Sequence, residues 1–165
     1  MSNKIWEFTG DTKICFGITL RRIRATVEFK LKCGIVVRKG ELGGWIEKES
    51  NLSGDAWVSG DAKVYGNTQV YGDAWVSGNA CVYGNAWIAG DAQVKSFEDY
   101  CVFKNTWSSF RWFTYTRSNK MWNVGYFYGI GAELIAKAYK DSEKSGKCYE
   151  AIVKAQEAIE KAMEV

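Results

Sequence analysis

The sequence predicts a mainly β protein built around a short, three-walled stack of strands, and three observations predict this fold. Glycine recurs every six residues from Gly54 to Gly90, and a branched aliphatic residue lies four places after each glycine. A small residue lies two places before each aliphatic one. The segment Gly-Asp-Ala-Trp-Val-Ser at 54–59 returns unchanged at 72–77, eighteen residues later, so three hexads are expected to close one triangular coil.

The chemistry of each hexad indicates which side chains point inward. Side chains alternate across a strand, so Val58 must face the side opposite to Trp57 and Ser59. Glycine tolerates a positive φ at the corner, and the Asp or Asn after it can accept hydrogen bonds from its own turn. The residues expected to stack in the interior are Val58, Val64, Val70, Val76, Val82, Ile88 and Val94.

This pattern resembles the left-handed parallel β-helix of the bacterial hexapeptide-repeat proteins. Their signature is an aliphatic residue followed four places later by a small one, as in Val58 with Ala62 and Val76 with Ala80. Repeats of five or nine residues do not fit the spacing. The resemblance implies a mainly β fold class, namely a short left-handed parallel β-helix with an N-terminal β cap and a C-terminal β-hairpin plus two helices.

The regions beside the repeats are expected to cover the open strand edges of the coil. Three segments are expected to form one compact unit: an N-terminal β cap at 1–45, the hexapeptide repeats at 46–103, and a C-terminal hairpin with helices at 104–165. Alternation of apolar and polar residues is cleanest over 19–29, which predicts a strand in the cap. Uncovered edges would template aggregation, so a cap is required. Ile46 and Leu52 keep the six-residue phase of Val58, which places the start of the coil before the perfect repeats.

The phase weakens after Val94, and we expect 100–103 to finish the last coil. A β-hairpin follows, with strands expected at 111–117 and 120–127. Helices are expected at 132–140 and from Ser145-Gly146 to about residue 163. The second helix has an apolar stripe formed by Cys148, Ile152, Ala155, Ile159 and Ala162.

Composition favours a cytoplasmic protein of a bacterial host. The five cysteines are odd in number and contain no CxxC pair, which is typical of free thiols in a reducing compartment. The apolar runs are too short to cross a membrane, so no membrane partner is expected. The net charge is only +3, although residues 1–53 are mildly basic, so a nucleic-acid duplex is not an expected partner.

Nearly the whole chain resembles a family of small proteins from bacteriophages and prophages. The resemblance is carried by the repeats, by Glu-Leu-Gly-Gly-Trp-Ile-Glu-Lys-Glu-Ser-Asn-Leu at 41–52, and by Trp-Phe-Thr-Tyr-Thr-Arg-Ser-Asn-Lys at 112–120. The family offers no established catalytic residues to carry over. Small accessory phage genes often counter host defence, so the resemblance implies an anti-defence role.

Catalytic signals are mostly missing from the sequence. It contains no histidine, so it has neither the His base of hexapeptide-repeat acyltransferases nor the three His ligands of β-helical carbonic anhydrases. Its glycines recur as corners rather than forming a nucleotide-binding loop, so we expect no cofactor, no metal and no catalytic residue. The stacked carboxylates Asp55, Asp73 and Asp91 are interpreted as turn caps, with a cation ladder as the alternative.

The positive signal is a set of outward aromatic residues. Trp57 above Trp75 is expected on one wall, Tyr65 above Tyr83 on the second, and Tyr71 with Trp87 on the third. Large exposed aromatic patches mark interfaces, which favours a homotrimer joined through its walls, or a ligand site. Aromatic rings stack on bases and Arg or Lys neutralises phosphate. The candidate ligand-binding residues are Trp57, Trp75, Trp87, Tyr65, Tyr83, Arg22, Arg24, Arg111, Arg117 and Lys120.

These signals favour a non-enzymatic, phage-type binding protein that counters host defence. It is expected to sequester a small host molecule, such as a nucleotide signal, or to block a host protein. One alternative is a degenerate acyltransferase-type enzyme with a carboxylate or cysteine in place of His, and Cys81 lies inside the perfect repeats. The other alternative is a structural phage component.

Overall fold

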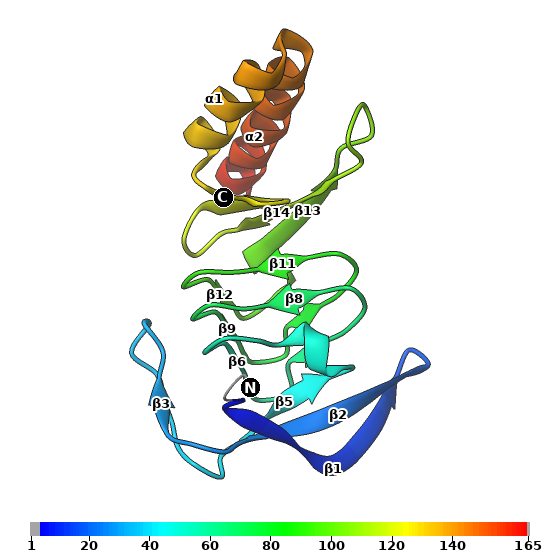
Figure 1. Cartoon of the computed structure of the whole chain (residues 1–165), viewed down its shortest axis with the longest axis vertical. Helices are drawn as coiled ribbons and strands as arrows, with labels where there is room; N and C mark the ends of the chain where they lie inside the picture. The colour runs from blue at the N-terminus through cyan, green and yellow to red at the C-terminus, as the bar shows by residue number, and fades with distance from the viewer. Residues whose placement is uncertain (1–3, 165) are drawn as a thin grey trace.

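The computed structural model describes residues 4–164. Residues 1–3 of the predicted N-terminal cap and residue 165 of the predicted C-terminal segment lie outside the described residues. The described chain is mainly β, with sixteen strands in five small sheets and two helices at the C-terminal end. The N-terminal strands lie at one end of the molecule, the repeats in the middle and the helices at the other end (Figure 1). No helix within the described residues has both the length and the apolar character that a membrane crossing requires.

The N-terminal part contains a long antiparallel hairpin and a short one. Its strands are β1 (Trp6–Cys15), β2 (Ile18–Ala25), β3 (Phe29–Lys30), β4 (Val36–Val37) and β5 (Leu42–Ile46). The Thr-Gly-Asp segment at 9–11 interrupts the β1–β2 register between Phe8 and Thr12 without ending the strand. β5 pairs antiparallel with β2 and parallel with β7, so one five-stranded sheet joins this part to the repeats.

The repeats form seven strands of two residues each. They are β6 (Trp57–Val58), β7 (Lys63–Val64), β8 (Gln69–Val70), β9 (Trp75–Val76), β10 (Cys81–Val82), β11 (Trp87–Ile88) and β12 (Gln93–Val94). Strands eighteen residues apart pair in parallel, so that Val58 lies opposite Val76 and Val64 opposite Val82. A short 3-10 helix precedes the repeats and another follows them, η1 (Glu49–Asn51) and η2 (Phe97–Asp99).

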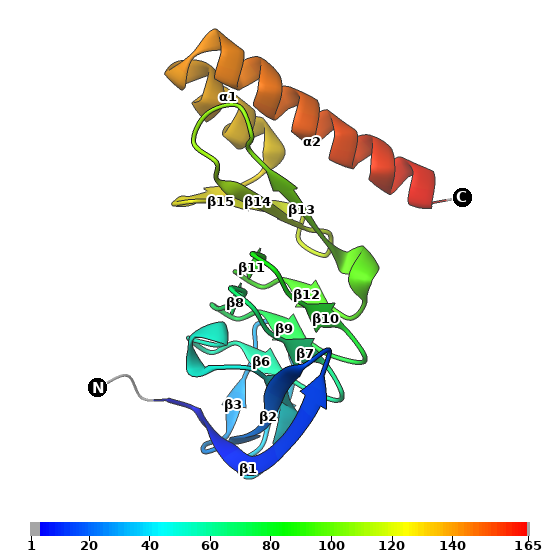
Figure 2. The same ribbon diagram turned by 90° about the vertical axis from the view of Figure 1, so that its right-hand side faces the viewer.

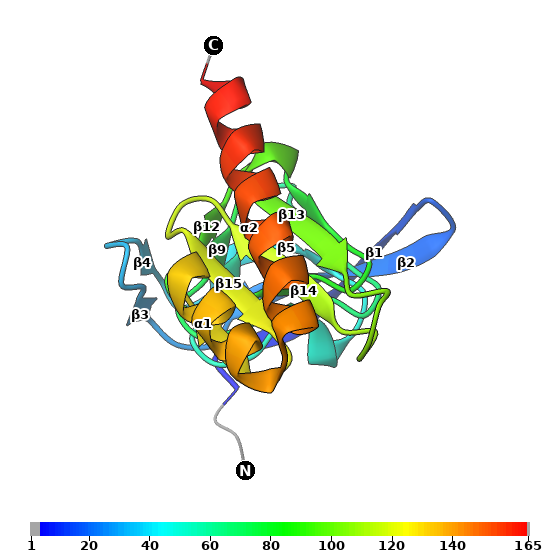
Figure 3. The same ribbon diagram turned by 90° about the horizontal axis from the view of Figure 1, so that it is seen from above.

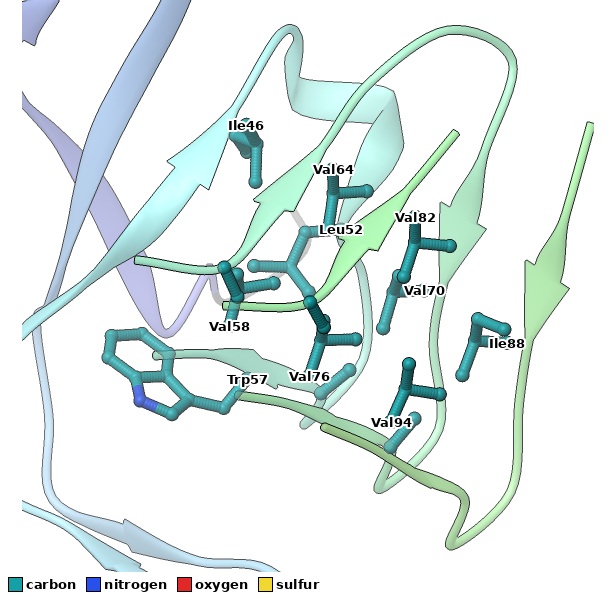
Figure 4. Packing of buried hydrophobic residues seen from close by; sticks show 14 of the residues in the cluster. Ile46, Leu52, Trp57, Val58, Val64, Val70, Val76, Val82, Ile88 and Val94 are labelled. Carbon is teal, nitrogen blue, oxygen red and sulfur yellow. The ribbon is translucent and has the colours of Figure 1, made fainter. Parts of the chain in front are cut away.

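The aliphatic column is buried as the hexad predicts. All seven aliphatic side chains are fully buried, and Ile46 and Leu52 continue the column at its start (Figure 4). Ile46 pairs with Val64 and Leu52 bridges to Val70, which confirms that the six-residue phase begins before the perfect repeats. The inward direction of the valines therefore follows from strand alternation.

The left-handed parallel β-helix predicted as the fold class is wrong. The strands divide among five small sheets, and all the long strands pair antiparallel with at least one neighbour. Among residues 4–164, parallel pairing is limited to β5, the two-residue repeat strands and the isolated bridge between Leu52 and Val70. The hexad period governs only the middle of the chain, because the two flanking regions have sequences without that period. The architecture is thus mainly β, with short strands in several sheets and two C-terminal helices.

At one corner the glycines Gly72 and Gly90 are stacked so closely that a side chain on Gly72 would be crowded. Gly72 has a φ of +72° and Gly90 a φ of +63°, in the left-handed region that favours glycine. A Cβ built on Gly72 would lie 3.0 Å from the backbone nitrogen of Gly90. Both the φ angle and the close approach therefore require glycine at this corner.

The C-terminal part is a four-stranded antiparallel sheet covered by two helices. Its elements are β13 (Tyr100–Lys104), β14 (Trp112–Thr116), β15 (Met121–Val124), β16 (Phe127–Gly129), α1 (Gly131–Asp141) and α2 (Glu143–Met163). Residues 100–103 belong to this sheet through β13–β14 pairing, so the prediction that they finish the last coil is wrong. The predicted hairpin is confirmed as the antiparallel β14–β15 pair within the sheet. The two helices are confirmed, and α2 crosses above the sheet (Figures 2 and 3).

The apolar stripe predicted for α2 is not the face that the helix buries. The buried residues of α2 are Gly146, Tyr149, Val153 and Gln156, whereas Ile159 is 43% exposed. Tyr149 decides this orientation, because its ring lies 4.8 Å from that of Phe113 in the sheet. One large aromatic contact determines the rotation of the helix more strongly than a stripe of small residues.

Candidate functional site

The expected aromatic pairs form on two of the three sheets of the repeats. Trp57 lies opposite Trp75 in the β6–β9 pair. Tyr65 and Tyr83 are stacked, with ring centroids 5.4 Å apart and an interplanar angle of 8°. Trp87 pairs with Gln69 on the remaining sheet. The eighteen-residue spacing therefore predicted which outward residues would be neighbours.

Trp57 is not open to solvent, so the expectation that it forms part of an exposed patch is wrong. Its side chain is only 1% exposed and meets the ring of Phe29 edge to face, with centroids 5.7 Å apart. The β3–β4 hairpin supplies Phe29, and Figure 4 shows Trp57 directed away from the aliphatic column toward the N-terminal segment. This hairpin leaves no open face of Trp57 for a ligand.

Trp75 is half-buried and its polar edge already has a partner. The indole Nε1 of Trp75 donates a hydrogen bond to Ser59 Oγ at 2.9 Å, and Lys95 Nζ lies 5.7 Å from the ring centroid. Tyr83 is the more open member of the tyrosine stack, with 47% of its side chain exposed. Two of the five aromatic candidates, Trp57 and Trp75, are thus in contact with other side chains of the chain.

Most of the predicted basic residues lie away from these aromatic rings. Arg22 donates to the carbonyl of Gly43 at 3.2 Å, and Arg24 forms an ion pair with Glu7 at 2.6 Å. Lys120 lies 3.4 Å from a carboxylate oxygen of Glu160 on α2, at the other end of the molecule. The backbone N–H of Arg117 donates to the carbonyl of Asp99 at the end of β14.

The structure brings two of the ten candidates, Trp87 and Arg111, into one cavity. We call this cavity the amide hollow, and its volume is about 380 Å³. Its lining residues are Asn67, Gln69, Asn85, Trp87, Arg111, Trp112, Thr114, Asn123 and Gly125. They come from the β8–β11 sheet and from the C-terminal sheet, so the amide hollow lies where these two parts of the molecule meet.

Two hydrogen bonds fasten the walls of the amide hollow to each other. The backbone N–H of Trp87 donates to Thr114 Oγ1 at 2.9 Å. The side-chain amide of Asn123 donates to the hydroxyl of Tyr71. Both Thr114 and Asn123 are buried residues of the C-terminal sheet. The hollow therefore has a fixed back wall, which is typical of a preformed site.

The lining of the amide hollow is rich in amide groups and has a single ionisable side chain. Four carboxamides face it, and each carries both donors and an acceptor. The indole rings of Trp87 and Trp112 supply flat apolar surface. Arg111 is exposed, and no carboxylate among the described residues lies within ion-pair distance of it. This combination suits a planar polar group attached to an anion.

A second cavity of equal volume, about 380 Å³, adjoins the first, and we call it the aromatic hollow. It is lined by Tyr83, Gly84, Asn85, Phe97, Tyr100, Cys101, Val102 and Trp112. The hydroxyl of Tyr100 donates to the carbonyl of Cys81 at 2.8 Å, and burial raises the pKa of this phenol to about 12. Burial also raises the pKa of the Cys101 thiol, which disfavours its thiolate.

Sequence reasoning missed the amide residues and Trp112. One signal for them was present, because Asn stands in place of Asp after the corner glycine at 67, 79 and 85, and two of these positions, 67 and 85, are eighteen residues apart. The side chains of Asn67 and Asn85 lie together at one corner, with Nδ2 and Oδ1 3.4 Å apart. Trp112 belongs to a strand outside the repeats, so no periodicity pointed to it.

The chain matches no family model, and no curated protein gives a significant match to it. Within residues 4–164, no group of Cys, Asp and Glu side chains is arranged to hold a metal ion.

Proposed function

We propose that this protein is a non-enzymatic binding protein that sequesters a small nucleotide-type molecule in the amide hollow. In this proposal it acts in the cytoplasm of a bacterial host as a phage-type anti-defence protein. The observation that carries the proposal is the lining of the amide hollow, where Trp87 and Trp112 lie beside four carboxamides and Arg111. Arg111 has no ion pair among the described residues.

Each part of the amide hollow fits one part of a nucleotide. An indole ring stacks on a base, and the carboxamides of Gln69 and Asn123 can donate to and accept from the edge of that base. The guanidinium of Arg111 matches the geometry of a phosphate with two parallel hydrogen bonds. The cavity volume of about 380 Å³ falls within the range of small-molecule sites.

The lining of the amide hollow favours binding over catalysis. Arg111 is its single ionisable residue among the described residues that line it, and an arginine does not act as a general base at neutral pH. The cysteine of the neighbouring hollow, Cys101, has a pKa raised by burial, which makes it a poor nucleophile. These features weigh against the degenerate acyltransferase, and nothing in the hollow favours a structural phage component.

A second candidate function is the blockade of a host protein. It is favoured by the exposed aromatic side chains of Tyr83, Phe97 and Trp112, which lie around the two hollows and are 47%, 60% and 38% exposed. Exposed aromatic patches are typical of protein interfaces. The same patch supports the proposal of a homotrimer, although buried Trp57 no longer contributes to that argument. Light scattering at micromolar concentration should give a trimer, and a monodisperse monomer would remove the oligomer from the proposal.

Calorimetry with AMP, GMP and their triphosphates tests the binding proposal. We expect saturable binding that weakens as salt is added, because salt screens the attraction between Arg111 and phosphate. Chromatography should recover the nucleotide unchanged. Gln69→Ala, at an exposed position of the hollow, should weaken binding without affecting melting, and Trp87→Ala should remove one stack, worth about 1–3 kcal/mol.

Arg111→Gln should reduce the salt dependence of binding. Its matched control is Arg24→Gln, because Arg24 is paired with Glu7 in the N-terminal hairpin, away from either hollow. A folded protein that binds none of these nucleotides would contradict the proposal. If the protein instead bound one host polypeptide, direct blockade of a host protein would be favoured. Transfer of an acyl group from acyl-CoA would overturn both binding functions.

A further inference from the structure

The two hollows share a ridge formed by the corner residue Asn85 and by Trp112. Both residues line the amide hollow and the aromatic hollow, and the two cavities have the same volume. Asn85 follows Gly84 at the corner between β10 and β11, so the two hollows lie on adjacent sheets of the repeats. One ligand can therefore occupy both hollows by passing over this ridge.

The aromatic hollow offers stacking surface for a second planar group. Tyr83 and Phe97 are exposed aromatic residues, and Tyr100 is held in place by its hydrogen bond to the carbonyl of Cys81. The ring of Tyr83 is itself supported from behind by the parallel ring of Tyr65. Because Tyr83 is exposed at the end of this stack, a base of the ligand can stack on its ring.

Two cations lie beside the ridge. Lys104 pairs with Trp112 across the β13–β14 register, and its Nζ lies 4.8 Å from the centroid of that ring. Arg111 precedes Trp112 in the sequence and lines the amide hollow. Neither cation has a carboxylate partner among the residues that the structure describes. Positive charge is thus available where a linkage between two groups would cross the ridge.

We infer that the ligand is a dinucleotide, with one base in the amide hollow, the other in the aromatic hollow, and its phosphates beside Lys104 and Arg111. This inference rests on the proposed function and names its ligand class. Two linked bases gain affinity because binding of the first places the second at millimolar effective concentration, which raises affinity by a factor of about 10²–10⁴.

Calorimetry on the full chain compares AMP, the linear dinucleotide pApA and cyclic di-AMP, together with the three guanine counterparts. We expect one dinucleotide per chain, bound at least about tenfold more tightly than the matching mononucleotide. The form that binds more tightly, linear or cyclic, then identifies how the two nucleotides of the ligand are linked. If the dinucleotide gains less than about tenfold over a mononucleotide that does bind, this inference is overturned while the proposed function survives. If none of the six compounds binds, this inference is overturned, and the proposed function is overturned with it when the triphosphates fail to bind as well.

Phe97→Ala separates the two hollows, because Phe97 lines only the aromatic hollow and its exposed position makes it dispensable for folding. It should weaken dinucleotide binding roughly 5- to 150-fold, the effect of one lost stack, and leave mononucleotide binding unchanged. The matched control is Phe16→Ala, since Phe16 is 86% exposed at the tip of the β1–β2 hairpin. Equal dinucleotide affinity in Phe97→Ala and the wild type would overturn the inference.

Discussion

The two hydrophobic cores of this protein are built by different means. The first core, between the repeats and the N-terminal strands, consists largely of small aliphatic side chains stacked at equal intervals. The second core, between the C-terminal sheet and the helices, is made mostly of large rings. In the first core a residue meets its own equivalent from three hexads later, as Val58 meets Val76. In the second core each contact joins residues of different kinds.

The ring of Phe113 illustrates the second type of packing. It lies 4.8 Å from the ring of Tyr149, 6.3 Å from that of Trp122 and 6.2 Å from that of Trp107. These three partners come from a helix, a strand and a loop. A repeated pattern therefore fixes the first core locally, whereas the aromatic core depends on elements that meet only in the folded chain. The candidate site lies between the two cores.

The largest expected effect comes from a charge in the first core. Val76→Asp should destabilise the protein by about 5 kcal/mol or more and unfold it, because the carboxylate would be fully buried between Val58 and Val94. Thermal melting followed by circular dichroism measures this change. The control Gln69→Asp places the same group at an exposed repeat position and should melt nearly as the wild type does. If Val76→Asp melted at the temperature of the wild type, the inward direction of the valine side chains would be contradicted.

The second core is tested by Phe113→Ala, which should cost about 4 kcal/mol through the cavity left among three rings. If the two cores are independent, hydrogen exchange should increase mainly in β13 to α2. Amides of the repeat ladder, such as the Trp57 N–H that donates to the Ala74 carbonyl at 2.9 Å, should stay protected. Equal loss of protection in both regions would show that they unfold as one unit.

The stacked corners are expected to differ in their tolerance of a side chain. Gly72→Ala should destabilise by about 2–3 kcal/mol, because it combines a positive φ with a Cβ only 3.0 Å from the Gly90 nitrogen. Gly84→Ala shares the positive φ but meets no atom within 4 Å, so it should cost about 1 kcal/mol. Urea denaturation of both variants gives the difference. If the two variants lost the same free energy of unfolding, the close approach of the stacked corners would not add to the requirement for glycine.

The smallest expected effect concerns the contact between the two regions. Thr114→Val keeps the shape of the buried side chain but removes the acceptor for the Trp87 N–H, and it should cost about 1 kcal/mol. Thr12→Val, at an exposed position of β1, serves as the control and should be nearly neutral. Urea denaturation measures both, and a neutral Thr114→Val would indicate that this hydrogen bond does not hold the walls of the amide hollow together.

Sequence alone determined the directions of side chains in the repeats. The six-residue period placed the valines inward, and the eighteen-residue period paired Trp57 with Trp75 and Tyr65 with Tyr83, because both results follow from strand alternation and equal spacing. Helices at the C-terminal end were predictable from local pattern as well. The predicted fold class was wrong, since a period confined to the middle of the chain says nothing about how the flanking strands pair.

Only the tertiary structure decided which outward residues stay open. The β3–β4 hairpin buries Trp57, although nothing within its hexad distinguishes it from Trp75. The amide hollow joins Trp87 to Arg111 and Trp112, which lie more than twenty residues away in a region with no repeat. Such a site depends on how two unlike surfaces dock, and docking is set by long-range packing of large side chains that no local period encodes.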